Sequence, residues 1–259
     1  MVGHPAEGPV ECVLLDLNTQ RDFLERGGAY PVANLETLLP TLRKLVAWIK
    51  RNHAPVVSSI DAHRTSELKP TDEPIHCLDH STGQRKVAFT LCHRFASVEF
   101  DNTLCVPSDM FARFQQLIFR KRDDDLLDNP KADRFLTQLP AEEFIIFGNG
   151  LERSVKMLSL GLLARGKRVS VVVDACGFWS RAKADLALRQ MAAKGATLVT
   201  VDELTTRKLS RRRRYYRRHP RSIEPDGNGQ PDEVNGSRNA HNGQGLPSRS
   251  GHGTIPDGQ

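Results

Sequence analysis

Residues 143–176 constrain the fold of this chain most strongly, because they have the pattern of a strand, a turn, a helix and a second strand. The apolar run 144–147 predicts a strand that is buried on both faces. Glycines on either side of Asn149 end this strand, because glycine adopts backbone angles that other residues avoid. Apolar residues recur at helical spacing over 151–164, and the β-branched run 169–173 predicts another strand. Such a βαβ unit indicates a parallel sheet.

The same alternation of strand-like and helix-like segments extends over most of the chain. We predict further strands over 11–17, 55–60, 87–90, 97–100, 117–119 and 197–201, and helices over 35–51, 108–115, 131–138 and 183–194. Alternating strands and helices form parallel sheets that are covered by helices on both faces. The predicted fold class is therefore a three-layer α/β/α domain with a mainly parallel, Rossmann-like sheet.

The composition changes at Arg207, and this change predicts where the domain ends. Residues 207–259 hold 11 Lys and Arg but 5 Asp and Glu, whereas residues 1–206 hold 26 of each sign. Because the later segment has few large apolar side chains, it cannot bury enough surface to offset the entropy of ordering. We expect a flexible arm over 1–9, a globular domain over 10–206 and a disordered tail after it.

The tail opens with a basic stretch, from Arg207 to Arg221, that contains nine basic residues and no acidic one. Tyr215 and Tyr216 lie among the arginines, and this mixture suits nucleic acid through base stacking and phosphate contacts. A solvated basic extension of the last helix explains the same composition. Both interpretations stay open.

Cysteine usage and hydropathy predict a cytoplasmic protein without a membrane partner. No CxxC spacing links the five cysteines, which are Cys12, Cys77, Cys92, Cys105 and Cys176. Cysteines without such spacing are typical of a reduced compartment. The sequence opens with no signal-like segment, and no apolar run approaches the length of a membrane span.

Polar residues that are candidates for catalysis or ligand binding follow four of the predicted strands. Asn18, Asp61, Lys121 and Ser154 each come a few residues after a strand, and the carboxyl ends of parallel strands share one edge of a sheet. Ser154 also lies in the first turn of a predicted helix, where free backbone N–H groups favour a nucleophile or an anion. Serine is equally common there as an ordinary helix-start residue.

A metal site is the second chemical prediction. Asp61 and His63 are spaced so that both project to one side of a strand end, and His76 can return across the following loop. One carboxylate and two imidazoles with open positions suit Zn²⁺, Mn²⁺ or Fe²⁺. The alternative is a solvated Asp61 and hydrogen-bonded loop histidines.

Several short motifs, in order and spacing, resemble the isochorismatase-like hydrolase family, and within it the nicotinamidases. The resemblance covers roughly residues 10–204, and each of its motifs is weak by itself. They are LLDLNTQRDF with Gln20, Asp22 and Phe23, then Asp61-Ala62-His63, Pro74-Ile75-His76-Cys77 with Gly83, GNGLERS ending in Ser154, and Asp174-Ala175-Cys176.

The resemblance implies a role for each matching position. The family's catalytic Asp falls on Asn18, its catalytic Lys on Lys121 and its nucleophilic Cys on Ser154. Asn149 and Gly150 fall where the family often has a strained peptide beside an oxyanion. It also implies the metal role of Asp61, His63 and His76, with Glu67 in place of a further histidine of some nicotinamidases.

Two of these positions depart from family chemistry. A serine hydroxyl needs a strong base nearby, and the side chain of Asn18 cannot accept its proton. Asp16 lies two residues earlier on the same strand, so we expect it to point the same way, but roughly 6–7 Å away. Lys121 is the other candidate base, in a Ser–Lys arrangement.

Three functional interpretations follow. The first is a hydrolase of a small amide or a related C–N bond, acting through Ser154 and Lys121. The second is a catalytically inactive family member that binds a small ligand or regulates. The third makes the basic tail the functional part and the domain an oligomeric scaffold. We expect a homo-oligomer. Four phenylalanines in the segment after residue 88 pack in the core, cap the site or form the oligomer contact; they are Phe95, Phe100, Phe111 and Phe114.

Overall fold

The sheet of the domain has seven strands, all parallel, in the computed structural model, which describes residues 10–67, 73–100, 106 and 110–207. In spatial order the strands are β3 (Phe95–Val98), β4 (Gln116–Lys121), β2 (Val56–Asp61), β1 (Val10–Leu17), β5 (Ala141–Asn149), β6 (Val169–Gly177) and β7 (Thr197–Val199). The three-layer, parallel α/β prediction is confirmed.

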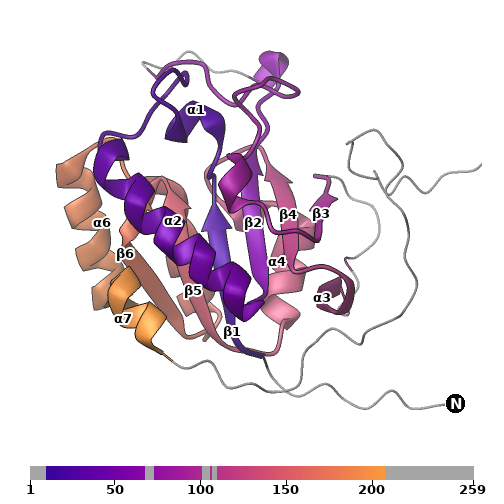
Figure 1. Ribbon diagram of the computed structural model, residues 1–259, viewed down its shortest axis with the longest axis vertical. Coiled ribbons are helices and arrows are strands. Elements are labelled where there is room, and N and C mark those ends of the chain that lie inside the picture. The colour runs from indigo at the N-terminus through magenta and orange to yellow at the C-terminus, as the bar shows by residue number, and fades with distance from the viewer. Residues whose placement is uncertain (1–9, 68–72, 101–105, 107–109, 208–259) are drawn as a thin grey trace, which may run out of the picture. The chain divides into compact units, whose positions relative to one another are not determined.

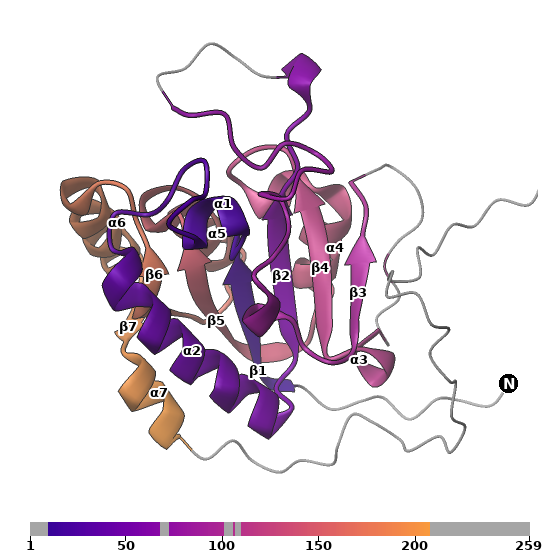
Figure 2. The ribbon, with the colours of Figure 1, turned by 45° about the horizontal axis from the view of Figure 1, so that its top comes forward.

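Helices cover both faces of this sheet (Figures 1 and 2). One face carries α1 (Arg21–Leu24), α2 (Leu35–Asn52), α7 (Val201–Thr206) and the 3₁₀ turn η2 (Ala88–Thr90). The other carries α3 (Met110–Arg113), η3 (Leu126–Asp128), α4 (Pro130–Gln138), η4 (Leu151–Val155), α5 (Lys156–Ala164) and α6 (Arg181–Ala193). A further 3₁₀ turn is η1 (Thr65–Glu67).

Strand β1 shows why the chain buries two apolar layers. Its side chains alternate between the faces, so Val13 and Leu15 enter the core below α4 and α5, while Leu14 enters the core below α2. Phe111 is also buried in the first of these cores, as predicted. The continuous apolar runs of the central strands follow from this two-sided burial.

Several predicted elements differ from the structure; the strand predicted over 197–201, for example, ends at Val199, because Val201 begins α7. The segment predicted as a strand over 87–90 is instead the 3₁₀ turn η2, because Thr90 donates its backbone N–H to the Val87 carbonyl, three residues back, at 2.9 Å. The predicted helix over 108–115 is the short α3, and residues 107–109 lie outside the described residues. Strand β6 continues to Gly177, because its pairing with β5 resumes after a register shift beyond Ile146.

The remaining domain predictions fall on parts of the chain that are not described. Residues 1–9 and 208–259, which include nearly all of the basic stretch, lie outside the described residues. Among the helices that are described, none is long and apolar enough to cross a membrane.

Candidate functional site

The carboxyl edge of the sheet brings the predicted site residues together. Asn18 follows β1, Asp61 and Lys121 end β2 and β4, and Asn149 ends β5. From β1 the sheet extends through β2 on one side and through β5 on the other. The direction of the strand order therefore reverses between β1 and β5, which flank the switch point of the sheet. Open α/β sheets bind ligands at such a point.

Ser154 lies in a π-helical turn, η4, rather than in a regular first α-helical turn. Val155 donates its backbone N–H to the Gly150 carbonyl at 3.0 Å, five residues back. Gly150 supports this turn with a φ of 82°, and its absent side chain leaves room beside Ser154. Single π turns are rare and occur often at functional sites.

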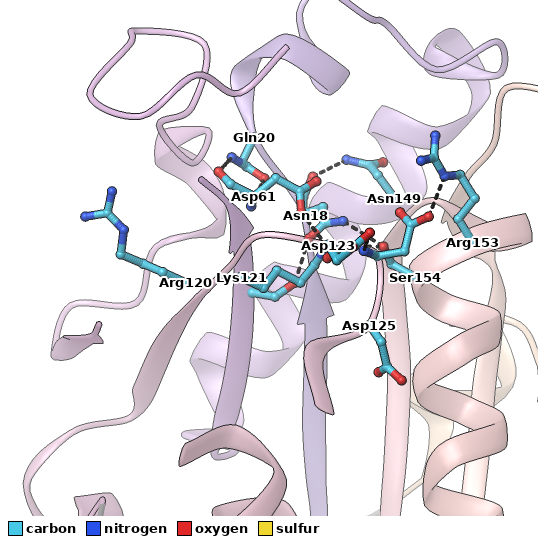
Figure 3. A network of polar contacts seen from close by, with 12 residues as sticks. Asn18, Gln20, Asp61, Arg120, Lys121, Asp123, Asp125, Asn149, Arg153 and Ser154 are labelled. Carbon is cyan, nitrogen blue, oxygen red and sulfur yellow. Dashed lines mark hydrogen bonds and ion pairs between the residues drawn. The ribbon is translucent and has the colours of Figure 1, made fainter. Parts of the chain in front are cut away.

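Two hydrogen-bond donors converge on the Ser154 hydroxyl oxygen (Figure 3). The Asn18 amide nitrogen Nδ2 lies 3.1 Å away, and the Lys121 ammonium Nζ lies 3.4 Å away. Ser154 is buried, as are both donors. Among the described residues, no carboxylate or imidazole is hydrogen-bonded to this hydroxyl, so the contacts supply no base for its proton.

The orientation of Asn18 is fixed from three sides. Its Oδ1 accepts a hydrogen bond from the Ser59 hydroxyl at 2.6 Å, which leaves Nδ2 as the donor to Ser154. The Asn149 amide donates to the Asn18 backbone carbonyl at 2.6 Å. Asn18 itself has a φ of 51°, a left-handed conformation that asparagine tolerates better than most residues.

Asp16 does not point toward Ser154, so the prediction that it shares a direction with Asn18 is wrong. Asp16 accepts a hydrogen bond from Ser58, whereas Asn18 accepts one from Ser59. Ser58 and Ser59 are neighbours in β2 and therefore face opposite sides of the sheet. The side chains of Asp16 and Asn18, which they contact, face opposite sides as well. The left-handed turn at Asn18 interrupts the strand alternation and causes this reversal. Asp16 instead forms a buried ion pair with Lys86 at 2.9 Å.

Lys121 is held as a hydrogen-bond donor. Its ammonium forms an ion pair with the Asp61 carboxylate and donates to the Asp123 carbonyl at 2.8 Å. Both charged groups are almost fully buried. Of the two basic residues that end β4, Lys121 points toward Ser154 and Arg120 points away from it (Figure 3); Arg120 pairs with Asp79 instead.

Gln20 fixes Asp61 from the backbone. Its side-chain amide donates to the Asp61 carbonyl at 2.9 Å and accepts the Asp61 N–H at 2.8 Å. The sequence identifies Gln20 only as part of the motif LLDLNTQRDF. That it holds Asp61 follows from tertiary contacts between the ends of β1 and β2. This clamp holds the backbone of Asp61, whose carboxylate pairs with Lys121 and lies near His63 and His76.

Asp61, His63 and His76 form the candidate metal centre, with one ligand atom from each within 4.8 Å of the others. Burial lowers the pKa of His63, which favours the neutral imidazole that a metal requires. Ligand atoms of a tetrahedral Zn²⁺ site are about 3.3 Å apart, so the three groups need to close in further to share one ion. The donor set fits a divalent cation, and Lys121 competes for the same carboxylate. The side chain of Glu67 lies outside the described residues.

Asn149 and Gly150 line the turn but serve neighbouring backbone groups. The Gly150 N–H donates to the Gly177 carbonyl at 3.0 Å. The Asn149 Oδ1 atom is buried without a hydrogen-bond partner among the described residues. Thus the turn holds Asn18 and β6 in place around Ser154.

An aromatic cluster beside the site was not predicted from the sequence. Tyr30 and Trp179 stack with ring centroids 4.7 Å apart, Phe23 lies 5.3 Å from Trp179, and His76 lies 5.2 Å from both Phe23 and Tyr30. Trp179 lies three residues after Cys176 in the sequence. Its position next to η4 becomes visible only in the structure, where the chain leaves the end of β6. The cluster gives the site an aromatic wall.

A cavity of about 420 Å³ opens beside this wall. Its lining residues are Tyr30, Glu73, Glu152, Arg153, Trp179, Ser180 and Lys183. Two of them, Glu152 and Arg153, directly precede Ser154 in η4. The cavity has the size of a small-ligand site.

Comparison with known proteins identifies the family of the chain. The family model of the isochorismatase domain matches residues 12–203. The nicotinamidase of Escherichia coli (strain K12) is 24% identical over 226 residues, covering 74% of this chain and 95% of that protein.

Two crystal structures share the fold. The pyrazinamidase of Pyrococcus horikoshii in complex with zinc has a TM-score of 0.57 at 20% identity, covering 73% of this chain and 99% of the other. An isochorismatase-like hydrolase from Alkaliphilus metalliredigens has a TM-score of 0.60 at 16% identity, covering 76% and 98%. With the family match spanning most of the chain, the protein belongs to the isochorismatase family.

Proposed function

We propose that this domain binds a small carboxamide at the site around Ser154, Asn18 and Lys121, without the turnover of a cysteine amidase. The Escherichia coli relative is a nicotinamidase, and this supports an aromatic amide as the ligand class. The wall of Phe23, Tyr30 and Trp179 supports a flat ring beside the hydroxyl.

The observation that carries this proposal is the pair of donors on the Ser154 oxygen. Asn18 and Lys121 both donate toward it, so the hydroxyl hydrogen is free to donate to a ligand carbonyl. Nucleophilic attack by a serine requires a base that accepts this hydrogen. The contacts of Ser154 therefore support recognition of a carbonyl oxygen more directly than they support its attack.

We further propose that Asp61, His63 and His76 hold a divalent cation next to this ligand. Such an ion would supply a Lewis-acid contact to a ring nitrogen or a carbonyl oxygen. Gln20 would hold the Asp61 carboxylate in position for it.

Calorimetric titration of the full-length protein with nicotinamide, with and without Zn²⁺, tests the proposal. We expect binding of nicotinamide, weakening by tenfold or more in Ser154→Ala, and no ammonia release in a coupled assay. Ser159→Ala is a matched control, because Ser159 is buried in α5 and its hydroxyl donates to the Val155 carbonyl of the same helical segment at 2.6 Å. Absence of binding to the unaltered protein would contradict the proposal.

Hydrolysis through Ser154 is the second candidate, and one observation favours it. The Lys121 ammonium and the Asn18 amide would stabilise a serine alkoxide, since hydrogen bonds to a charged form favour that form. Ammonia release that is lost in Ser154→Ala would establish this candidate over pure binding. A panel of amides with Mn²⁺ and Fe²⁺ beside Zn²⁺ completes the assay.

A further inference from the structure

A buried carboxylate beside the cavity lacks half of its hydrogen bonds. The Glu152 Oε1 atom accepts the backbone N–H groups of Trp179 and Ser180, both at 2.9 Å. The Oε2 atom of the same carboxylate is buried and has no partner among the described residues. Glu152 is only 8% exposed but lines the cavity, so the cavity is the side from which a donor can approach this oxygen. A buried, unpaired carboxylate oxygen is costly and calls for a donor.

The cations around the cavity do not fill this position. Arg153 is occupied by two other carboxylates, Glu73 at 2.6 Å and Asp124 at 2.8 Å. Burial lowers the pKa of the Arg153 guanidinium, but the hydrogen bonds to Glu73 and Asp124 and their charges outweigh burial, so the pKa is raised. Lys183 lines the cavity from the exposed surface of α6. Glu73 and Glu152 are thus balanced in number by Arg153 and Lys183 among the lining residues, so the feature that selects a ligand is the unpaired oxygen of Glu152, which requires a hydrogen-bond donor.

We propose that this cavity is a subsite for a planar group rich in N–H donors, such as an amidinium, which binds the free oxygen of Glu152 beside the Trp179 ring. A planar cation can donate to the carboxylate and lie against aromatic rings at the same time. An anionic group is disfavoured next to Glu152, because its carboxylate already accepts the Trp179 and Ser180 N–H groups that directly precede α6. The subsite extends the proposed ligand site at Ser154 and names a second feature of its ligand.

Three isosteric probes test this proposal on the full-length chain. Benzamidine carries a charged, donor-rich group, benzamide a neutral one with two N–H donors, and benzoate a group without donors. We expect affinity to fall in that order, with benzamidine at least tenfold tighter than benzoate. Benzoate binding as tightly as benzamidine would overturn the proposal, as would the absence of binding of all three probes.

Trp179 is a built-in reporter, because Trp48 is the only other tryptophan of the sequence and lies in the core below α2. In Trp48→Phe, the emission of Trp179 should change on titration with benzamidine, and calorimetry on the unaltered chain gives the affinity. Benzamidine that binds without changing Trp179 emission would place it elsewhere and overturn the proposal.

Glu152→Gln assigns the effect to the carboxylate, since its amide oxygen can still accept the two backbone N–H groups. We expect at least a tenfold loss of benzamidine affinity and no loss for benzoate, while Glu142→Gln, at an exposed position of β5, changes neither. Unchanged benzamidine affinity in Glu152→Gln would overturn the proposal. The Ser154→Ala variant separates the two sites: it should keep benzamidine binding even if nicotinamide binding fails.

Discussion

At the scale of single residues, the Ser154 hydroxyl has two hydrogen-bond donors next to it and no proton acceptor hydrogen-bonded to it among the described residues. Ser154 and Asn18 are in contact at 3.1 Å, so a carboxylate at position 18 would meet the side chain at position 154 directly. Lys121 already lies within 3.4 Å of the same atom. The surrounding geometry is therefore suited to an acid–base pair that the two side chains themselves do not form.

We predict that Asn18→Asp combined with Ser154→Cys creates or raises nicotinamide hydrolysis. The new carboxylate can accept a proton from the thiol, and such general-base contributions amount to about 10²–10⁴-fold. Initial rates of ammonia release measure the gain, and each single variant is the control. No gain in the double variant would count against the matching of these positions to the family's catalytic pair.

The pKa of His63 gives a prediction for pH dependence. Burial is the main cause of its lowered pKa, so the folded chain binds fewer protons there than the unfolded chain. The contribution of His63 to stability is fully present above its ordinary pKa of about 6.5 and is lost as the pH falls below it. Melting temperatures between pH 7 and pH 5 should therefore fall less steeply in His63→Gln than in the unaltered protein. The exposed His93→Gln should melt like the unaltered protein; equal slopes for all three would contradict the assignment.

At the scale of elements, close backbone contact fixes the turn that carries the site. A Cβ atom on Gly148 would lie 2.1 Å from the Leu17 carbonyl oxygen, and its φ is +117°. The end of β5 therefore packs directly against the end of β1, which brings η4 next to Asn18. Gly166 also has a positive φ, of +71°, but a Cβ atom there would meet nothing within 4 Å.

These two glycines form a matched pair of substitutions. Gly148→Ala should lower the free energy of unfolding by about 3 kcal/mol or more, because both strain and a backbone clash oppose it. Gly166→Ala should lower it by about 1–2 kcal/mol, the cost of a left-handed backbone alone. Urea titrations measure both values. Equal losses would show that the contact between β1 and β5 is not the reason for the glycine.

Elements also show where local sequence signals reach their limit. Asparagine is a favoured N-cap residue and Asn34 directly precedes α2, but its side chain does not cap that helix. It donates instead to the Cys176 carbonyl at 3.0 Å and accepts the Phe178 N–H at 3.1 Å. The capping signal was correct for the helix start, while the end of β6 competed successfully for the side chain.

At the scale of the whole molecule, we expect the domain to fold without the basic tail. The last helix, α7, begins with a capping box in which Thr200 and Glu203 satisfy each other's backbone N–H groups. Asp174 accepts a further hydrogen bond, from the Val201 N–H at 2.8 Å, and so ties α7 to β6. The domain thus has a well-defined last element before the tail.

We predict that removal of residues 208–259 leaves the melting temperature of the domain within about 2 °C of the full-length value, since the removed segment has few apolar side chains to bury. If the tail binds nucleic acid, the same truncation should abolish salt-sensitive binding of single-stranded RNA in a fluorescence anisotropy titration. RNA binding that survives the truncation would place the interaction on the domain. Sedimentation of both forms tests the expected homo-oligomer in the same experiment.

The sequence by itself determined the layer architecture and the family. Strand and helix periodicities depend on neighbours a few residues apart, and so do the motifs around Asn18, Asp61 and Ser154. It also named Asp61, His63 and His76 as a group, because all three lie near the end of one strand and its loop.

Tertiary structure alone decided the directions of the side chains at the site. The left-handed Asn18 places Asp16 and Asn18 on opposite faces, and the π turn η4 presents Ser154 to two donors. The cavity beside Glu152 combines segments from four distant parts of the chain. Such features depend on the packing of strand ends against each other, and no local pattern of residues encodes that packing.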